Sequence, residues 1–307
     1  MLKGKYTKEH EKEKIPLKFK FFKLEVLDRY KENPIYTFSE HGVSLSLGIK
    51  DEYYRSPDIA EEDKIEIQSL GYAYRKKDNS KVVVTYLPYL AKLSKKHQDY
   101  WASFEEDGEC IIDSDFFDQE IKAEFTDRAN IFDAFLQELA EINKICVMAN
   151  RPNLFKSDYS GNKPSNFSWP TKLTSKSYNE LVHLFDKLIS ENINRNFFDG
   201  KIEFMENNIQ KGTLRLLEEF LRKFFRFPDQ KPQEDMLKHF KLIRNERQKP
   251  AHKIEENKYD PGYYEKIKKL VTASYRSIRT LRLIFTNFPG VRNNYQPPSW
   301  LQRGKIM

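Results

Sequence analysis

In roughly the first hundred residues, apolar positions come in short runs, several of them alternating with polar positions, as strands with one buried face require. The runs are rich in β-branched and aromatic residues, which favour strands. Between the last two runs, residues 75–80 are charged and polar and suit a hairpin turn. The pattern predicts an antiparallel sheet with strands at residues 19–27, 42–49, 64–74 and 81–87.

Helical spacing follows this predicted sheet. Pro88 ends the last strand, and residues 89–104 repeat apolar and aromatic side chains at helical intervals, which predicts a helix packed on the sheet. We interpret His97 and Trp101 as packing residues of this helix. Residues 105–127 are acidic and irregular, and we expect them to form solvated surface or, alternatively, to dock on a basic part of the chain.

The second half of the chain has the period of amphipathic helices. A helix is predicted over residues 131–148, and residues 151–174 contain three prolines without periodicity, which is typical of a linker. Helices are then predicted over residues 178–193 and 209–225, from Pro232 onward, and over 263–285. Four helices with short connections predict a bundle.

The fold class predicted from these patterns is α+β. An N-terminal antiparallel β-rich domain with helices is expected over residues 1–150, and an all-α four-helix bundle over residues 175–290. Residues 151–174 would link the two, and residues 291–307 would form a C-terminal tail. We expect the N-terminal domain to serve in sensing, targeting or partner binding.

Composition excludes several classes of protein. With 307 residues, 14% of them aromatic, the chain can bury a sizeable core and lacks the signature of disorder. The two cysteines, Cys110 and Cys146, lie far apart and outside any metal-binding motif, which argues against a disulfide framework or a structural zinc site and favours a reducing cytoplasm. No apolar run could span a membrane, and the first residues are too charged for a signal peptide.

The net charge of +7 is unevenly distributed. Residues 211–307 are strongly basic, whereas residues 1–210 carry a small net negative charge and residues 101–150 are markedly acidic. Basic surfaces attract polyanions such as RNA. A polyanionic partner is therefore expected at the C-terminal end of the chain.

The segment of residues 242–254, LIRNERQKPAHKI, carries the most distinctive chemistry. On a helix, Arg247 falls within about 20° of Met236, and Arg244 within about 80°, so both arginines extend the apolar face. Pro250 interrupts the helix and is expected to bring His252 back beside the arginines. An inward-facing arginine requires either a paired carboxylate or a function.

Arginine and histidine together suit cleavage of an RNA phosphodiester. Histidine exchanges protons near neutral pH, and the planar arginine fork stabilises the charge of the phosphorane. The 2′-hydroxyl supplies the nucleophile, so neither a metal ion nor a cofactor is expected. The sequence also has no HExxH motif and no glycine-rich phosphate loop.

At Arg247-Gln-Lys-Pro-Ala-His252 the sequence resembles the HEPN superfamily, whose enzymes carry an arginine and a histidine separated by four to six residues. The resemblance covers about residues 175–287. It implies an all-α domain, a homodimer that apposes two motifs, and a metal-independent endoribonuclease (a hydrolase) acting as a toxin or in antiviral defence, with an antitoxin or other defence-system protein as a possible partner. By position, Arg247 and His252 match the catalytic pair.

Other residues near the motif are candidates for binding the RNA backbone. They are Arg244, Asn245, Lys249 and Lys253, together with Arg276 and Arg279 on the last long helix. Two alternatives remain open for Arg247: a structural ion pair with a buried carboxylate, and RNA binding without cleavage. A non-catalytic RNA-binding or dimerisation adaptor is the corresponding alternative function.

Overall fold

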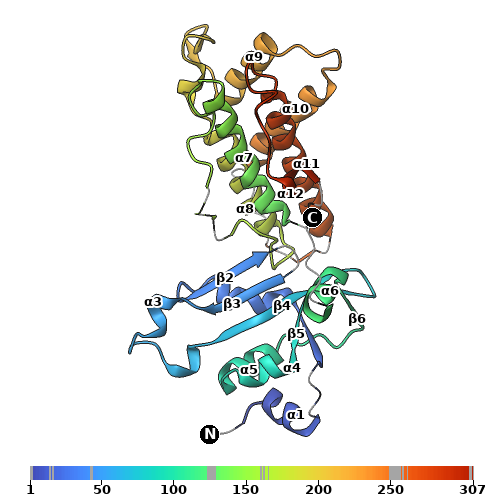
Figure 1. The fold of residues 1–307 in the computed structure, drawn as a ribbon. Helices are drawn as coiled ribbons and strands as arrows, with labels where there is room; N and C mark the ends of the chain where they lie inside the picture. The colour runs from blue at the N-terminus through green and yellow to red at the C-terminus, as the bar shows by residue number, and fades with distance from the viewer. Residues whose placement is uncertain are drawn as a thin grey trace. The chain divides into compact units, whose positions relative to one another are not determined.

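The computed structural model describes residues 3–13, 15, 17–41, 44–122, 129–159, 161, 163–164, 166–248, 257, 259–260, 262–303 and 306 of the chain. They form two compact units, Met1–Asn130 and Ile131–Met307, which we call the N-terminal and C-terminal units. The chain is a mixed α+β protein that combines an antiparallel sheet with helices, as the sequence predicts (Figure 1).

The N-terminal unit is built on an antiparallel sheet. Its strand order is β1 (Phe19–Phe22), β5 (Lys81–Tyr86), β4 (Glu66–Arg75), β3 (Ser44–Ile49) and β2 (Tyr36–His41), and β6 (Cys110–Ile112) pairs with the end of β4. The predicted hairpin turn is confirmed, because the Arg75 amide donates to the Ser80 carbonyl (2.9 Å) between β4 and β5.

Alternation along the strands divides this sheet into two buried faces. Val83 lies in the core on one face, whereas Val82 and Val84 lie in a smaller core on the other. The first face is covered by α1 (Lys5–Glu13), α2 (Asp28–Lys31), α4 (Leu87–Lys92) and α5 (Lys95–Ala102), and the second by α6 (Ser114–Lys122). The remaining short turns are η1 (Leu24–Leu27), α3 (Asp51–Tyr54) and η2 (Glu61–Asp63).

The packing role predicted for His97 and Trp101 is confirmed. Both side chains are fully buried, and both bond to the Tyr30 hydroxyl, at 2.8 Å from His97 Nδ1 and 2.9 Å from Trp101 Nε1. Burial lowers the pKa of His97, although Asp63 opposes this shift. The residues belong to a buried polar network inside the fold.

Two predictions for the N-terminal unit need correction. Residues 89–104 form two helices instead of one, because Leu93 is extended and Ser94 caps α5 by accepting from the His97 amide (3.4 Å). Residues 105–127 are not wholly irregular surface, since they supply β6 and α6 and bury Phe116 completely. Phe116 packs with Cys110 and Ile112 against the smaller core of the sheet.

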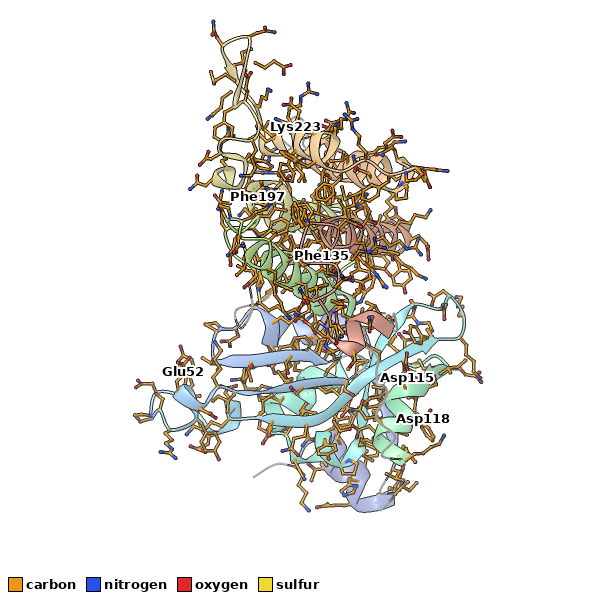
Figure 2. All side chains as sticks on the ribbon, turned by 45° about the horizontal axis from the view of Figure 1, so that its top comes forward. Glu52, Asp115, Asp118, Phe135, Phe197 and Lys223 are labelled. Carbon is orange, nitrogen blue, oxygen red and sulfur yellow. The ribbon has the colours of Figure 1, made fainter. Side chains whose placement is uncertain are left out.

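The C-terminal unit is a helical bundle. Figure 1 shows α7, α8, α10 and α11 running together, and Figure 2 places Phe135 and Phe197 among the helices, where both are buried. Its elements are α7 (Ile131–Met148), α8 (Ser175–Asp186), η3 (Lys187–Glu191), η4 (Arg195–Phe198), β7 (Met205–Glu206), β8 (Ile209–Gln210), α9 (Thr213–Phe224), α10 (Lys231–Gln248), α11 (Gly262–Phe285) and α12 (Ser299–Arg303). No helix of the described residues is long and apolar enough to cross a membrane.

The two units divide at Asn130, ahead of the linker expected at residues 151–174. Helix α7 was expected in the N-terminal domain, but it packs along α11 in the C-terminal unit. Glu138 of α7 is fully buried and forms an ion pair with the buried Arg282 of α11. Apolar periodicity predicted the helix without indicating which neighbour it would pack against.

Several described residues of the segment expected to be a linker are packed into the bundle. Leu154, Phe155 and Phe167 are fully buried, and the Asn143 side chain bonds to both the amide (2.9 Å) and the carbonyl (3.0 Å) of Phe155. Part of the expected tail, residues 291–307, is packed as well, since Val291 is fully buried. Prolines and missing periodicity indicate irregular backbone, but they do not indicate exposure.

Candidate functional site

The two inward-facing arginines of the motif lie in the last turns of α10. Helix α10 buries Met236, Phe240 and Ile243, and Arg247 continues this stripe toward its C-terminal end. Arg247 and Arg244 both reach the end of α8, where they meet carboxylates. Both arginines therefore point toward α8, but they remain partly exposed, Arg244 at 43% and Arg247 at 28%.

Asp186 is the centre of this arrangement. It is the last residue of α8, its side chain is only 1% exposed, and its Oδ2 lies 2.9 Å from Arg244 Nη1 and 2.5 Å from Arg247 Nη1. The hydroxyl of Ser190 donates to the other oxygen, Oδ1. A buried carboxylate with three donors is a fixed, charge-compensated anchor for both arginines.

The chain reaches Ser190 and Glu191 through η3, a π-helical turn that continues α8. Turns of this kind are rare and are frequent at functional sites. Glu191 forms a second ion pair with Arg247 Nη1 and lies 3.7 Å from Arg244 Nη1, but its side chain is 40% exposed. The turn therefore places the exposed Glu191 against the same pair of arginines that the buried Asp186 of α8 contacts.

The hydrogen bond to Asp186, followed by that to Glu191, raises the pKa of Arg247 above its already high ordinary value. Arg247 is 28% exposed, and both of its ion pairs use Nη1. Within the described part of the chain, Nε and Nη2 of Arg247 have no hydrogen-bond partner. These donors form the planar edge that binds phosphate or carboxylate oxygens in pairs.

The histidine of the motif falls outside the described residues. His252, Lys249 and Lys253 all lie in residues 249–256, which the structure does not describe. The predicted site residues whose geometry is described are Arg244, Asn245, Arg247, Arg276 and Arg279.

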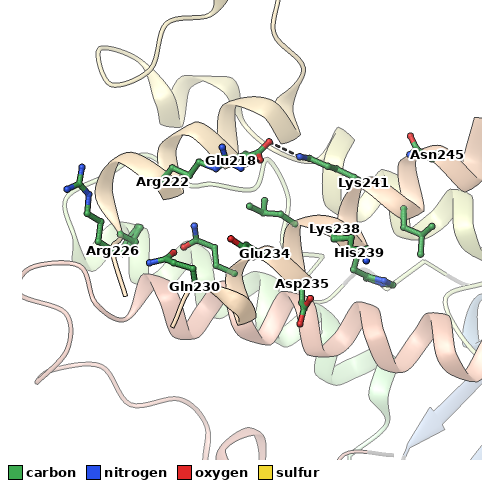
Figure 3. A pocket seen from close by; sticks show the side chains of 14 residues that line it. Glu218, Arg222, Arg226, Gln230, Glu234, Asp235, Lys238, His239, Lys241 and Asn245 are labelled. Atoms are coloured by element: carbon green, nitrogen blue, oxygen red, sulfur yellow. Dashed lines mark hydrogen bonds and ion pairs between the residues drawn. The ribbon is translucent and has the colours of Figure 1, made fainter. Parts of the chain in front are cut away.

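Asn245 lies apart from Arg247. It is exposed and lines a pocket of about 880 Å³ between α9 and α10. Figure 3 shows this pocket, with Glu218 of α9 ion-paired to Lys241 of α10 at 2.8 Å. The arginine pair faces α8 instead, so Asn245 does not join it.

Arg276 and Arg279 also lie away from the arginine pair. Arg276 lines a second pocket between α11 and the start of α10, near Lys231 and Asp235. At a rise of about 1.5 Å per residue, that end of α10 is roughly 20 Å from Arg247 along the helix axis. Arg279 donates to the Tyr275 hydroxyl (3.4 Å). Among the described residues, Arg276 and Arg279 do not form a continuous phosphate-binding stripe with Arg247.

The sequence patterns did not reveal four residues of this cluster. They are Asp186, Ser190 and Glu191, together with Lys156, whose ammonium donates to the Glu191 carbonyl (2.7 Å). One signal was present, because Asp186 falls on the edge of the apolar stripe of its helix, where a carboxylate needs a partner. Among the described residues, no group of three or more His, Cys, Asp or Glu is arranged to hold a metal ion.

Searches of known protein families, of curated proteins and of solved structures found no match to this chain.

Proposed function

We propose that the chain is a metal-independent endoribonuclease of HEPN type, with Arg247 and His252 as its catalytic pair. The observation that carries the proposal is the guanidinium of Arg247, held at the end of α10 by the buried Asp186 and, among the described residues, otherwise paired only with the exposed Glu191. Arg244, anchored by the same carboxylate, provides a second positive charge beside it.

In the proposed reaction the 2′-hydroxyl of the RNA attacks the adjacent phosphorus. The new O2′–P bond forms as the P–O5′ bond breaks, and Arg247 stabilises the charge of the phosphorane. The 2′-hydroxyl loses its proton to a base, and the departing O5′ gains a proton. We assign this proton transfer to His252. The products carry 2′,3′-cyclic phosphate and 5′-hydroxyl ends.

The HEPN resemblance also supports a proposal for the oligomeric state, the location and the biological role of the protein. An enzyme of this type would act as a homodimer in the cytoplasm, as a toxin or an antiviral defence effector, and the N-terminal unit would sense a trigger or bind a partner. Asn245, Arg276 and Arg279 lie apart from the arginine pair, so Arg244 is the described residue that we assign to substrate binding.

The second candidate function is a non-catalytic RNA-binding or dimerisation adaptor. One observation favours it: two carboxylates, Asp186 and Glu191, already balance the charges of Arg244 and Arg247. Such a compensated cluster would also serve to fasten α8 to α10 without any reaction.

Single-turnover cleavage of a structured RNA in EDTA tests the two functions. The wild-type protein is expected to cut with 2′,3′-cyclic phosphate ends, and His252→Ala and Arg247→Ala are each expected to lower the rate by about 10² to 10⁴. Arg215→Ala is the matched control, because Arg215 is a surface arginine of the same unit that also pairs with a carboxylate, Glu219 at 2.8 Å.

Each variant is checked for folding by thermal unfolding. RNA binding by the wild type without any cleavage would favour the adaptor. Cleavage of a substrate that lacks the 2′-hydroxyl, or wild-type rates in folded Arg247→Ala and His252→Ala proteins, would reject the proposed mechanism.

A further inference from the structure

The two carboxylates that meet the arginine pair differ in burial and in support. Asp186 is 1% exposed and receives three hydrogen bonds, from Arg244, Arg247 and Ser190. Glu191 is 40% exposed, and its side chain hydrogen-bonds to Arg247 and forms a longer ion pair with Arg244 (3.7 Å). Asp186 is therefore fixed in the interior, whereas Glu191 is held, among the described residues, only by ion pairs at the surface.

The charges of the cluster depend on Glu191. With both carboxylates present, two negative charges balance the two arginines. If the Glu191 side chain swings into solvent, one net positive charge is left, and Lys156, which donates to the Glu191 carbonyl, adds another nearby. Exposed ion pairs contribute little to stability, so this exchange is inexpensive.

From this geometry we infer that the Glu191 carboxylate occupies the position of a substrate phosphate and must be displaced before an RNA phosphodiester binds Arg244 and Arg247. The inference rests on the proposed function, whose site it shares. Carboxylate and phosphate oxygens are both acceptors for guanidinium donors, so a phosphate oxygen can take the place of the Glu191 carboxylate oxygen at Arg247 Nη1. Glu191 thereby restrains the site until a polyanion competes for it.

The test measures binding, separately from cleavage. The probe is a uniformly 2′-O-methylated RNA, which keeps the phosphodiesters but has no free 2′-hydroxyl. Its dissociation constant is measured by fluorescence anisotropy at low salt, where surface charges are least screened. Glu191→Gln, which keeps the size of the side chain and removes its charge, is expected to bind about three- to tenfold more tightly than the wild type.

Glu180→Gln is the matched control. Glu180 lies on α8, is 61% exposed and pairs weakly with Lys176 (3.8 Å), so this variant changes the net charge equally without touching the cluster. Its affinity is expected to stay within about twofold of the wild type. In the Arg247→Ala background, Glu191→Gln is expected to give no gain.

Equal affinities of Glu191→Gln and the wild type, including no measurable binding by either, would overturn the inference. So would an equal gain in Glu180→Gln, or a gain that persists without Arg247. A wild type that cuts no RNA while Glu191→Gln binds more tightly would reject the nuclease and keep the inference. Cleavage by the wild type with no effect of Glu191→Gln on binding would keep the nuclease proposal and reject the inference about Glu191.

Discussion

At the scale of single residues, the two arginine clusters of the bundle differ in what their loss leaves behind. Arg282 is buried and pairs with Glu138, which is fully buried. Arg247 is partly exposed, and without it Asp186 keeps its bonds to Arg244 and Ser190. Removing Arg282 leaves the buried carboxylate of Glu138 without its cation, whereas removing Arg247 leaves Asp186 paired with Arg244.

Arg282→Ala is therefore expected to lower the free energy of unfolding by about 3 to 5 kcal/mol, and Arg247→Ala by less than about 2 kcal/mol. Urea unfolding of the two variants measures this difference. Removal of both Arg244 and Arg247 is expected to cost more than the sum of the single losses, because it leaves Asp186 without a cation. A loss from Arg247→Ala as large as that from Arg282→Ala would instead indicate that Arg247 is structural.

His239 gives the bundle a dependence on pH. Burial lowers its pKa to about 4, and its Nε2 lies 3.1 Å from the Ser274 hydroxyl. In the unfolded chain the pKa of His239 is about 6.5, so below that pH the unfolded state takes up a proton more readily than the folded state. The contribution of neutral His239 to stability is therefore fully present above about pH 6.5 and is lost as the pH falls toward about 4. On going from pH 7 to pH 5, protonation of this residue is expected to lower the free energy of unfolding by about 2 kcal/mol.

The measurement compares the wild type with His239→Asn by urea unfolding at both pH values. The variant, which cannot take up the proton, is expected to lose about 2 kcal/mol less on acidification. The same pH dependence in both proteins would show that His239 does not titrate as its burial implies.

At this scale the sequence predicted the direction of Arg247 but not its partners. The helical period alone places the arginine on the buried face of α10, and the structure agrees. Asp186 and Glu191 lie 61 and 56 residues away along the chain, among 46 acidic residues. Nothing local selects these two, because their meeting depends on how α8 packs against α10.

At the scale of elements, α6 depends on a missing side chain in the sheet. The ring of Phe116 occupies the space beside Gly71, so that a Cβ added to Gly71 would lie 2.3 Å from the Cδ2 atom of Phe116. Gly71→Ala is expected to push α6 away and to lower stability by about 1 to 3 kcal/mol in chemical unfolding. Gly48→Ala on β3 is the control, since its nearest neighbour would be at an ordinary 3.6 Å.

The double variant Gly71→Ala with Phe116→Leu tests the cause. A smaller side chain on α6 relieves the overlap, so the double variant is expected to lose less than the sum of the two single variants. Strict additivity would mean that Gly71 and Phe116 do not interact.

Long helices were predicted more accurately than short elements. The helix at residues 131–148 was predicted with the bounds of α7, and the helix at 263–285 nearly with those of α11, because many turns repeat the same apolar face. The strands β2 and β6 were missed. In β2, Tyr36 and Phe38 alternate with polar residues and could have been recognised, whereas β6 has only three residues and no pattern.

At the scale of the whole molecule, the boundary between the units predicts which fragments fold on their own. A fragment of residues 131–307 keeps α7 and the entire core of the C-terminal unit. A fragment of residues 151–307, cut at the expected linker, lacks Phe132, Phe135, Leu139 and Ile142, which are all buried in that core. The first fragment is expected to unfold cooperatively on heating, and the second is expected to have no cooperative transition.

Circular dichroism at equal concentrations, with the full chain as reference, measures both fragments. A cooperative transition in the fragment of residues 151–307 would place the boundary where the amino-acid pattern suggested and would make α7 dispensable.

Because α7 packs on α11, there is a delay during synthesis between the appearance of α7 and that of its partner helix. Glu138 and Arg282 are 144 residues apart, so at roughly 5 to 20 residues per second the ribosome needs about 7 to 30 seconds to supply the partner of Glu138. During that interval the apolar face of α7 has emerged without the helix that covers it. Nascent chains of this protein are therefore expected to bind a holdase chaperone, and to be released once α11 has left the exit tunnel.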